Sequence, residues 1–591
     1  MNGISERHLV NDMVTSCVKN HGGVPMLFVN DSPVNPAAYI TYFTDKNMYK
    51  EFAGEGYTLY SVPTYFTEQT INEFSRLPPF QIGIFDKIYD GGKPDYSVFD
   101  GLIADILENC PKAMIFPRVN VSIPYEWEER NPDELCEFGY AEHHRASFFS
   151  DAWAEETKRL LSMFIAHIEE SSYRDHIIGY QISAGNTEEW FPFDMKGCRG
   201  IRATEKFREY CLEKYGRENG SDAEFAELVS EITADRVIDF CKTVKDCTDG
   251  RIAAGAFYGY TYEVPEADRG HFCLRKVLES PYVDFLCSPN SYYKTRVVGV
   301  EHPYMLPIDS LKKAGKLYLC ENDTRTHLST PPNDIPRYQS PVWFGPAPEI
   351  TCEIMKMHFA KAFCHGNGMW WFDMWGGWYR DERYMNLLGK LRRIYAENIE
   401  NNLESASEVA MFYDEKSPLL MTSEHPAYRL MYNIRERLGF MGAPYDMYLA
   451  DDFDDVCDKY KALILVQSAK TSISEEIIKK AKEKGRELFV ISLDRIPGSS
   501  EEKKKLCEDI YYDVVTPAQL REFCRKCGVH IYTDKKAVIY SSKSYVFMHT
   551  GEDGEYNFSF DGKTSFVDEY TGETVTFPKT LQKGKSYLFR R

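Results

Sequence analysis

The stretch HIIGYQISAGNTEEWFPF, residues 176–193, decides the fold that this chain is expected to adopt. Its first half is an apolar run, which is typical of a strand buried on both faces. The run breaks at Gly185, where the chain can turn tightly. Polar and aromatic side chains crowd the exit of this strand: Asn186, Thr187, Glu188, Glu189 and Trp190.

A second strand exit of the same kind lies in KLYLCENDTRTHL, residues 316–328. Leu317 to Cys320 is a short apolar run that predicts a strand, and Glu321 follows it directly. In a parallel barrel the carboxyl ends of the strands carry the chemistry. Since two carboxylates at two strand ends are the minimal equipment for cleaving a glycosidic bond, we take glycoside cleavage as the working hypothesis.

Composition limits the other possibilities. A chain of 591 residues is expected to form two to four domains, and its net charge of −20 disfavours binding to nucleic acid. No run of about 18 apolar residues predicts a membrane span, and the polar start lacks a cleavable secretion signal. The 16 scattered cysteines favour free thiols in a reducing cytoplasm, and Cys524 and Cys527 have no second pair at zinc-site spacing.

The first 400 residues alternate between buried strands and helical stretches, after a polar N-terminal helix. Eight such units predict a closed (β/α)₈ barrel, a TIM barrel, over residues 1–400. The expected strands are 24–30, 57–62, 113–121, 177–182, 252–257, 283–287, 317–320 and 368–372. The expected helices are 66–77, 96–109, 151–170, 204–215, 225–245 and 349–364.

Two smaller domains are expected after the barrel. Residues 401–515 contain three apolar strands, at 408–414, 462–467 and 487–492, with a helix at 474–484, which predicts a small open α/β domain. Residues 516–591 show short alternating strands separated by glycine-containing turns, typical of an antiparallel, sandwich-like β domain.

The adjacent pair Glu188 and Glu189 supplies the candidate general acid. Such an acid needs a carboxyl whose pKa is raised by an apolar wall or a neighbouring charge. We expect only one of the pair to point inward, and we favour Glu189 over Glu188 because Trp190 offers that wall. The alternative is a solvated loop carboxylate, the commoner fate of a single glutamate.

Glu321 is the candidate nucleophile. Asp323 and Arg325 follow it closely and offer groups that orient a carboxylate or keep it ionised, and Arg118 is a further partner for the nucleophile or a sugar oxygen. The alternative is a structural ion pair between Glu321 and Arg325 beneath a loop. The spacing of the two carboxyls decides the outcome, because retaining enzymes hold them about 5–5.5 Å apart and inverting enzymes about 6.5–9.5 Å apart.

Other strand exits offer groups for binding a sugar. Aromatic residues make up 14% of the chain, and their faces suit both sugar stacking and core packing. Asn186 is a candidate donor to a sugar hydroxyl, and Tyr292 to the nucleophile. The remaining candidates are Tyr258, Trp371, Asp373 and Trp375. No serine-hydrolase, P-loop, zinc-protease or dinucleotide motif is present, and no metal site is predicted.

This order of parts resembles the family 42 β-galactosidases and their relatives in glycoside hydrolase clan A. The resemblance rests on the strand-end glutamates Glu189 and Glu321, the tryptophan-rich strand GMWWF, and the domain that opens SEVAMFYD. The clan's acid/base signature is an adjacent Asn-Glu pair, whereas Asn186 here is followed by Thr187 and the glutamates come later. The chain therefore resembles a divergent relative.

The resemblance implies a retaining exo-glycosidase that uses two glutamates and no cofactor. Its substrate would be a small β-linked sugar, first of all a β-galactoside; β-mannosides, β-glucosides or α-L-arabinosides would use the same machinery. The middle domain would resemble an amidotransferase without its nucleophile and assemble trimers, with a dimer as the alternative. A non-catalytic carbohydrate-binding protein on a decayed barrel remains the competing reading, and an amidotransferase activity lacks a Cys-His-Glu set.

Overall fold

The computed structural model of this chain describes most of its 591 residues. The described ranges are 13–67, 83–137, 145–194, 199–264, 269–292, 296–329, 344–420, 430–492 and 515–591. The predicted polar N-terminal helix and most of the predicted helix at 66–77 lie outside these ranges.

A closed barrel of parallel strands forms the first domain, as the sequence predicts, in the order β10-β11-β4-β5-β6-β7-β8-β9. Its strands are buried along their whole length apart from Met114, which explains why they appear as continuous apolar runs. The strands are β4 (Ala37–Ile40), β5 (Leu59–Tyr65), β6 (Met114–Asn120), β7 (Gly179–Ser183), β8 (Ala253–Phe257), β9 (Phe285–Pro289), β10 (Leu317–Asn322) and β11 (Gly368–Phe372).

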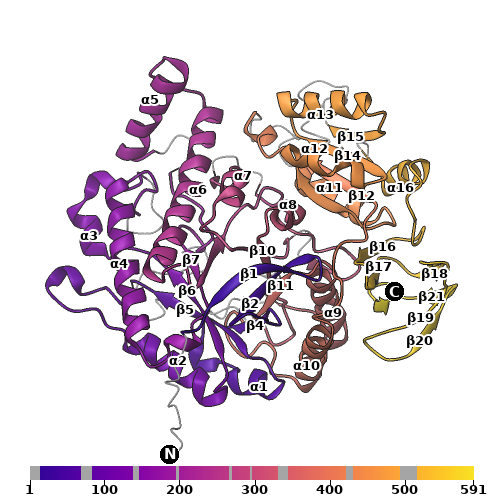
Figure 1. The fold of residues 1–591 in the computed structure, drawn as a ribbon, viewed down its shortest axis with the longest axis horizontal. Coiled ribbons are helices and arrows are strands. Elements are labelled where there is room, and N and C mark those ends of the chain that lie inside the picture. The colour runs from indigo at the N-terminus through magenta and orange to yellow at the C-terminus, as the bar shows by residue number, and fades with distance from the viewer. Residues whose placement is uncertain are drawn as a thin grey trace, which may run out of the picture.

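Helices surround the barrel, and the hairpin of α5 and α6 projects beyond it (Figure 1). The helix α4 shows how the sequence specifies them: the Ser150 hydroxyl caps its first turn by accepting from the Trp153 N–H, and an apolar stripe faces the strands. The helices are α1 (Tyr49–Gly54), α2 (Ser97–Asn109), α3 (Tyr125–Arg130), α4 (Asp151–Glu170), α5 (Ile201–Tyr215), α6 (Asp222–Cys247), α7 (Leu274–Glu279), α8 (Ile308–Lys313), α9 (Pro348–Cys364) and α10 (Glu382–Glu397).

The prediction that residues 24–30 form the first barrel strand is wrong. β1 (Ser16–His21) and β2 (Val24–Val29) instead form an antiparallel hairpin, continued by β3 (Ser32–Pro33), and the first barrel strand is β4. The hairpin turns at Gly22 and Gly23, whose φ angles of 56° and 82° favour glycine. Since the Ser16 hydroxyl accepts from the N–H of Ala253 at the start of β8, the hairpin lies at the amino end of the barrel, away from the strand exits.

The middle domain has a parallel sheet in the order β13-β12-β14-β15, the order expected of a flavodoxin-like fold. The sequence analysis found three of these strands and missed β13, a short segment whose residues do not form a long apolar run. The elements are β12 (Val409–Tyr413), α11 (Leu430–Gly439), β13 (Asp446–Leu449), α12 (Phe453–Val456), β14 (Ala462–Gln467), α13 (Ser472–Glu483) and β15 (Leu488–Ser492).

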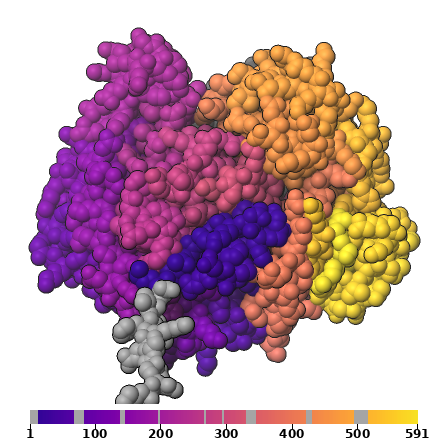
Figure 2. Space-filling model, in the orientation of Figure 1, coloured from indigo at the N-terminus to yellow at the C-terminus, as the bar shows by residue number. Residues whose placement is uncertain are grey.

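The C-terminal domain is antiparallel, as predicted, and follows a helix. It packs, with the middle domain, on one side of the barrel (Figures 1 and 2). The elements are α16 (Pro517–Lys526), β16 (Ala537–Ser541), β17 (Tyr545–Thr550), β18 (Gly554–Tyr556), β19 (Ser565–Val567), β20 (Thr574–Thr576), β21 (Lys579–Leu581) and β22 (Ser586–Arg590). Among the described residues, none of the helices combines the length and apolar character needed to cross a membrane.

The interior of the barrel leaves no room for a side chain at Gly255. A Cβ there would lie 2.2 Å from the backbone oxygen of Phe285 on the neighbouring strand, which cannot rotate away. We therefore expect Gly255→Ala to destabilise the protein by about 1–3 kcal/mol, the usual effect of overpacking a core. Gly101→Ala is the matched control, because nothing lies within 4 Å of its Cβ position in α2, and it should stabilise by about 0.5–1 kcal/mol. Thermal unfolding of both variants tests this; equal midpoints would contradict it.

Candidate active site

Arg118 on β6 is the centre of the candidate site. Its guanidinium is buried at the carboxyl end of the barrel, where Nε lies 2.9 Å from Oε2 of Glu188 and Nη1 lies 3.2 Å from Oε2 of Glu321. One cation thus joins the exits of β7 and β10, two strands far apart in the sequence. Three aromatic rings surround the guanidinium at 4.6–5.5 Å: Tyr42, Phe257 and Phe372.

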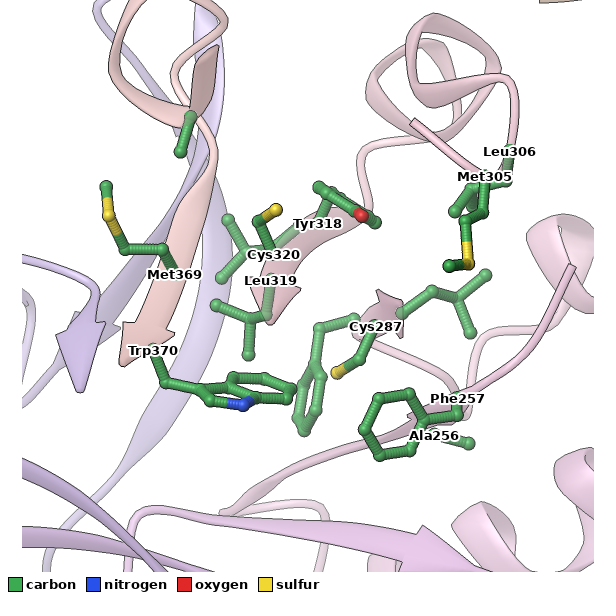
Figure 3. Close-up of a cluster of buried hydrophobic side chains, with 14 of the residues drawn as sticks. Ala256, Phe257, Cys287, Met305, Leu306, Tyr318, Leu319, Cys320, Met369 and Trp370 are labelled. Carbon is green, nitrogen blue, oxygen red and sulfur yellow. The ribbon is translucent and has the colours of Figure 1, made fainter. Parts of the chain in front are cut away.

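An apolar layer supports this charged group. Trp370 and Phe257 belong to the buried cluster drawn in Figure 3, and their rings meet edge to face with centroids 5.8 Å apart. Trp370 pairs in register with Glu321, and its indole N–H donates to Oε2 of that glutamate at 3.2 Å. The layer therefore fixes one side of the Glu321 carboxyl.

Glu188 is held almost rigidly. Besides Arg118, its carboxyl accepts from the Tyr42 hydroxyl at 3.1 Å and from the Asn120 amide at 3.2 Å. Burial raises the pKa of Glu188, while the Arg118 charge and these hydrogen bonds oppose the shift. This carboxyl therefore has a charged partner and two further donors before any ligand enters.

Glu189 has a different environment. It is partly exposed and accepts from the hydroxyls of Tyr260, at 2.9 Å, and Thr187, at 2.6 Å, both of which are neutral donors. Burial raises the pKa of Glu189, and the negative charge of Asp323 adds to the shift. Its own charge in turn raises the pKa of Glu321, so the two carboxyls lie within electrostatic range of each other.

The loop that carries both glutamates is strained. Thr187, Glu188 and Trp190 have φ angles of 55°, 64° and 63°, a region that costs side-chain-bearing residues about 1–3 kcal/mol each. The Asn186 N–H donates to the Phe191 oxygen at 2.9 Å and closes the loop. Because of these turns both adjacent carboxyls face the strand ends, whereas the sequence analysis expected only one to do so.

Trp190 does not form the expected apolar wall beside Glu189. Its indole is fully buried, donates to the Ile182 oxygen at 3.0 Å, and packs among the rings of Phe148 and Phe240 on the outer side of the barrel. The positive φ of Trp190 turns it away from the glutamates. Tyr260, beyond β8, lies against Glu189 instead.

Asp323 organises the exit beyond Glu321. It forms ion pairs with Arg296 and with Arg325, the latter at 2.7 Å, and accepts from the Tyr292 hydroxyl at 2.9 Å. Burial alone would raise the pKa of Asp323, but the two guanidiniums hold it below its ordinary value. Arg325 and Tyr292 thus contact Asp323, whereas both were predicted to contact Glu321.

Burial raises the pKa of Glu321 to about 8, with Arg118 opposing the shift and Asp323 adding to it. The negative charge of Glu189 also raises the pKa of Glu321. The arrangement can therefore hold one proton near neutral pH, which suits an acid next to a base.

Because side chains alternate along a strand, two of the predicted aromatic residues, Trp371 and Tyr258, point away from the candidate site. Trp371 follows the inward Trp370 and points outward, where its ring meets Tyr379 at 6.2 Å. Tyr258 likewise follows the inward Phe257; its ring stacks on His271 and its hydroxyl donates to a backbone oxygen of α6.

The other two candidates after β11 belong to a turn. Asp373 accepts from the Tyr39 hydroxyl at 2.9 Å and from the N–H groups of Gly377 and Trp378 at 2.9 and 2.7 Å. Burial raises its pKa to about 6. Trp375 is buried against Trp378, at 5.5 Å between centroids, and both residues thus shape the rim of the barrel.

Asn186 lines a small cavity next to the site. Its neighbours at this cavity include Asn120, Ser122 and Arg145, with Trp153 forming part of an apolar wall. The cavity lies beside Glu188 at the exits of β6 and β7. Asn120, not Asn186, donates to the Glu188 carboxyl.

Several residues that shape the site were not predicted. The sequence does not show which of the adjacent Trp370 and Trp371 points into the barrel. The pairing of Trp370 with Glu321 identifies Trp370 as the inward residue. Tyr260 lies in an aromatic exit, FYGYTY, which is a usable signal. Tyr42 and Arg296 come from loops whose sequences have no distinguishing pattern. Within the described residues, no group of three or more histidine, cysteine or acidic side chains is arranged to hold a metal ion.

Comparison with known proteins bears on the fold. No protein-family model matches the chain, and no curated protein matches it. Solved structures do match the chain. The chain shares the fold of the family 42 β-galactosidases. A β-galactosidase from the psychrophilic Marinomonas ef1 matches with a TM-score of 0.60 at 11% identity, over 94% of this chain and all of the other.

Two further structures give the same result. Gan42B, a family 42 β-galactosidase from G. stearothermophilus, matches with a TM-score of 0.59 at 11% identity, over 94% of this chain and 98% of the other. The β-galactosidase of the haloarchaeon Halorubrum lacusprofundi gives 0.57 at 12% identity, over 94% and 99%. The resemblance inferred from the sequence is thus confirmed for the fold, at an identity that fits a divergent relative.

Removing the Arg118 charge should destabilise the protein by an amount that depends on pH. Arg118→Met leaves Glu188 and Glu321 buried without their cation, and breaking a buried ion pair costs about 3–5 kcal/mol. Loss of the cation raises both carboxyl pKa values in the folded state further above those of the unfolded state. Protonation then favours folding at low pH, and the stability is lost as pH rises, so the deficit should be larger at pH 8 than at pH 5.

Thermal unfolding at the two pH values measures this effect. Adding Glu188→Gln and Glu321→Gln to the Arg118→Met variant serves as the control, and it should reduce the difference between pH 5 and pH 8. The same deficit at both pH values in the single variant would show that Arg118 is not the counter-ion of these carboxylates.

Proposed function

We propose that this protein is a retaining exo-glycosidase for terminal β-linked sugars, with β-galactosides as the first candidate substrate. The observation that supports this most is the buried cluster in which Arg118 joins the carboxyls at the exits of β7 and β10. The fold shared with structures named as β-galactosidases adds support. The proposed mechanism is a double displacement by two glutamates.

Glu321 acts as the nucleophile in this proposal. Arg118 and Trp370 both donate to its Oε2, which stabilises the carboxylate and leaves Oε1 as the oxygen we assign to attack the anomeric carbon. The attack forms a glycosyl-enzyme ester and expels the leaving group. Asp323, fixed by its two arginines, borders the nucleophile without replacing it.

Glu189 acts as the general acid and base. Its donors are neutral hydroxyls, so it holds a proton more readily than Glu188, whose partner is a guanidinium. Glu189 gives this proton to the leaving oxygen, then takes one from the water that hydrolyses the ester. Glu188 is a positioning residue that holds Arg118 in place.

The proposed substrate is a small neutral carbohydrate, and the reaction needs no cofactor. β-Mannosides, β-glucosides and α-L-arabinosides are alternative substrates for the same catalytic residues. The proposed contacts to the sugar are Arg118, Asn186, Tyr292, Asp323, Arg325 and the aromatic residues at the rim of the barrel. A carbohydrate-binding protein without activity is the second candidate. The described cysteines are free thiols and mostly buried, which supports a cytoplasmic location. By analogy with the family, we propose that the protein assembles as a trimer or a dimer.

Activity on a panel of aryl β-glycosides tests the assignment. The panel holds galactosides, mannosides, glucosides and xylosides, plus aryl α-L-arabinosides. Glu321→Gln should abolish turnover, while Glu189→Gln should lower kcat/KM, which reports formation of the glycosyl-enzyme, by about 10²–10⁴-fold for a poor leaving group and far less for dinitrophenolate, which needs no proton. Glu188→Gln should lower activity for both leaving groups alike. If instead Glu188→Gln lowers activity far more for the poor leaving group than for dinitrophenolate, the acid would be Glu188, and a wild type that cleaves nothing would favour the binding protein.

The pH dependence of kcat/KM gives a second test. In the proposed mechanism Glu189 must carry a proton, and burial raises the pKa of this carboxyl. We therefore expect the basic limb, where Glu189 loses this proton, to lie above the ordinary pH range of carboxyl ionisation. In Glu189→Gln, measured with the dinitrophenyl substrate, the basic limb should disappear. A basic limb that persists in that variant would contradict the assignment of Glu189.

A further inference from the structure

The loop between β9 and α8 brings two groups to Asp323. Of this β9–α8 loop, residues 290–292 and 296–307 are described. Tyr292 donates to Asp323 and Arg296 forms an ion pair with it. Arg296 is held in turn by the backbone oxygens of Asn290 and Ser291, so its guanidinium is fully engaged.

The C-terminal domain contacts this loop through His549. The N–H of Gly299 donates to Nε2 of His549 at 2.9 Å, in a fully buried setting. The imidazole therefore carries its proton on Nδ1, which lies 2.8 Å from the Ser586 hydroxyl. That hydroxyl donates to the Glu353 oxygen of α9 at 3.0 Å. Burial lowers the pKa of His549 to about 3, so the ring stays neutral and the direction of these bonds is fixed.

A second chain of hydrogen bonds joins the same loop to the exit of β10. His302 Nε2 lies 3.0 Å from the Val297 oxygen, an acceptor, so Nε2 carries the proton and Nδ1 accepts. His358 Nε2 donates to that Nδ1 at 2.8 Å, and His358 Nδ1 accepts from the Thr324 hydroxyl at 2.7 Å. Burial lowers the pKa of both histidines well below the ordinary value, so one arrangement of protons persists.

The middle domain also contacts the β9–α8 loop. Arg435 of α11 is buried and donates to the Tyr304 oxygen at 3.0 Å and to the Ser291 hydroxyl at 3.1 Å. It also pairs with Glu263, which accepts from the Tyr292 N–H. Both accessory domains therefore bond directly to the loop that supplies Asp323 with its partners.

We propose that the C-terminal domain is part of the catalytic apparatus, with His549 as a positioning residue that holds residues 296–302 so that Arg296 stays on Asp323. This inference rests on the proposed function for its effect on catalysis, but the clamp itself is a structural claim that stands apart from activity. If the domain only packs against the barrel, the loop keeps its order without His549.

The charge of Arg296 reaches Glu321 as well as Asp323. Release of Arg296 removes a positive charge near Glu321 and should raise the pKa of that carboxyl. The acidic limb of kcat/KM, which reports ionisation of the nucleophile, should then move to higher pH. The other groups that face Glu321 are Tyr42, Arg118, Glu189, Tyr260, Cys287 and Asp323, and none of them is substituted in this experiment. Release of Arg296 also raises the pKa of Asp323, which keeps Arg325 as its cationic partner.

The test compares three full-length variants. His549→Ala removes the acceptor of the Gly299 N–H, whereas His549→Gln retains an acceptor at the Nε2 position. Val575→Ala is the control, because Val575 lies in the domain's own core and its truncation destabilises the domain without touching the loop. The readouts are backbone hydrogen exchange of peptides from residues 296–304, thermal unfolding, and the pH profile on the aryl β-glycoside that the wild type cleaves best.

His549→Ala should speed exchange in residues 296–304 by about tenfold or more and lower kcat by about 10–100-fold with the acidic limb moved to higher pH. His549→Gln should restore most of each effect, and Val575→Ala should change only the melting temperature. Unchanged exchange in 296–304 in His549→Ala would overturn the clamp. Faster exchange with a normal pH profile would overturn the catalytic role, and a wild type without activity would refute the proposed function while exchange still tests the clamp.

Discussion

The burial of Arg118 is the constraint on which the candidate site depends. A guanidinium removed from water costs several kcal/mol unless charged groups and good hydrogen bonds compensate it. Glu188, which follows the neighbouring strand β7, and Glu321, at the end of β10 across the barrel from β6, provide that compensation at 2.9 and 3.2 Å. Because the partners come from different strand exits, the ion pairs also fix the relative positions of those exits. The interaction that compensates the buried guanidinium therefore also brings the carboxyls of Glu188 and Glu321 together.

The buried and partly buried charges of the site do not balance. Three guanidiniums face four carboxyls: Arg118, Arg296 and Arg325 against Glu188, Glu189, Glu321 and Asp323. Glu188 and Asp323 have the closest cationic partners, so the surplus falls on Glu189 and Glu321. A buried surplus of negative charge is relieved by keeping a proton. The charge count therefore adds to burial in raising the pKa values of Glu189 and Glu321.

Sequence alone predicted the parts of this structure that follow from periodicity. Seven of the eight barrel strands, and the position of Glu321 at a strand end, follow from buried apolar runs, and Arg118 lies where a strand exit was expected. The β1–β2 hairpin was mistaken for a barrel strand because Val24 to Val29 is as apolar as the true strands; only the Gly22-Gly23 turn marks it. The orientation of Trp370 against Trp371 needed the register with β10. Partners such as Tyr42 and Arg296 come from loops, whose course depends on tertiary contacts that no local pattern encodes.

The loop from Gly185 to Trp190 shows why the acid/base motif was hard to recognise. β7 ends at Ser183, and Glu188 and Glu189 come several residues after it. Reaching the barrel axis from there requires the chain to fold back, and the left-handed angles at Thr187, Glu188 and Trp190 achieve this. Their strain is sustained by the buried indole of Trp190 and by the ion pair of Glu188 with Arg118. The charge geometry of the site therefore depends on where the folded loop places the carboxyls and not on their spacing along the chain.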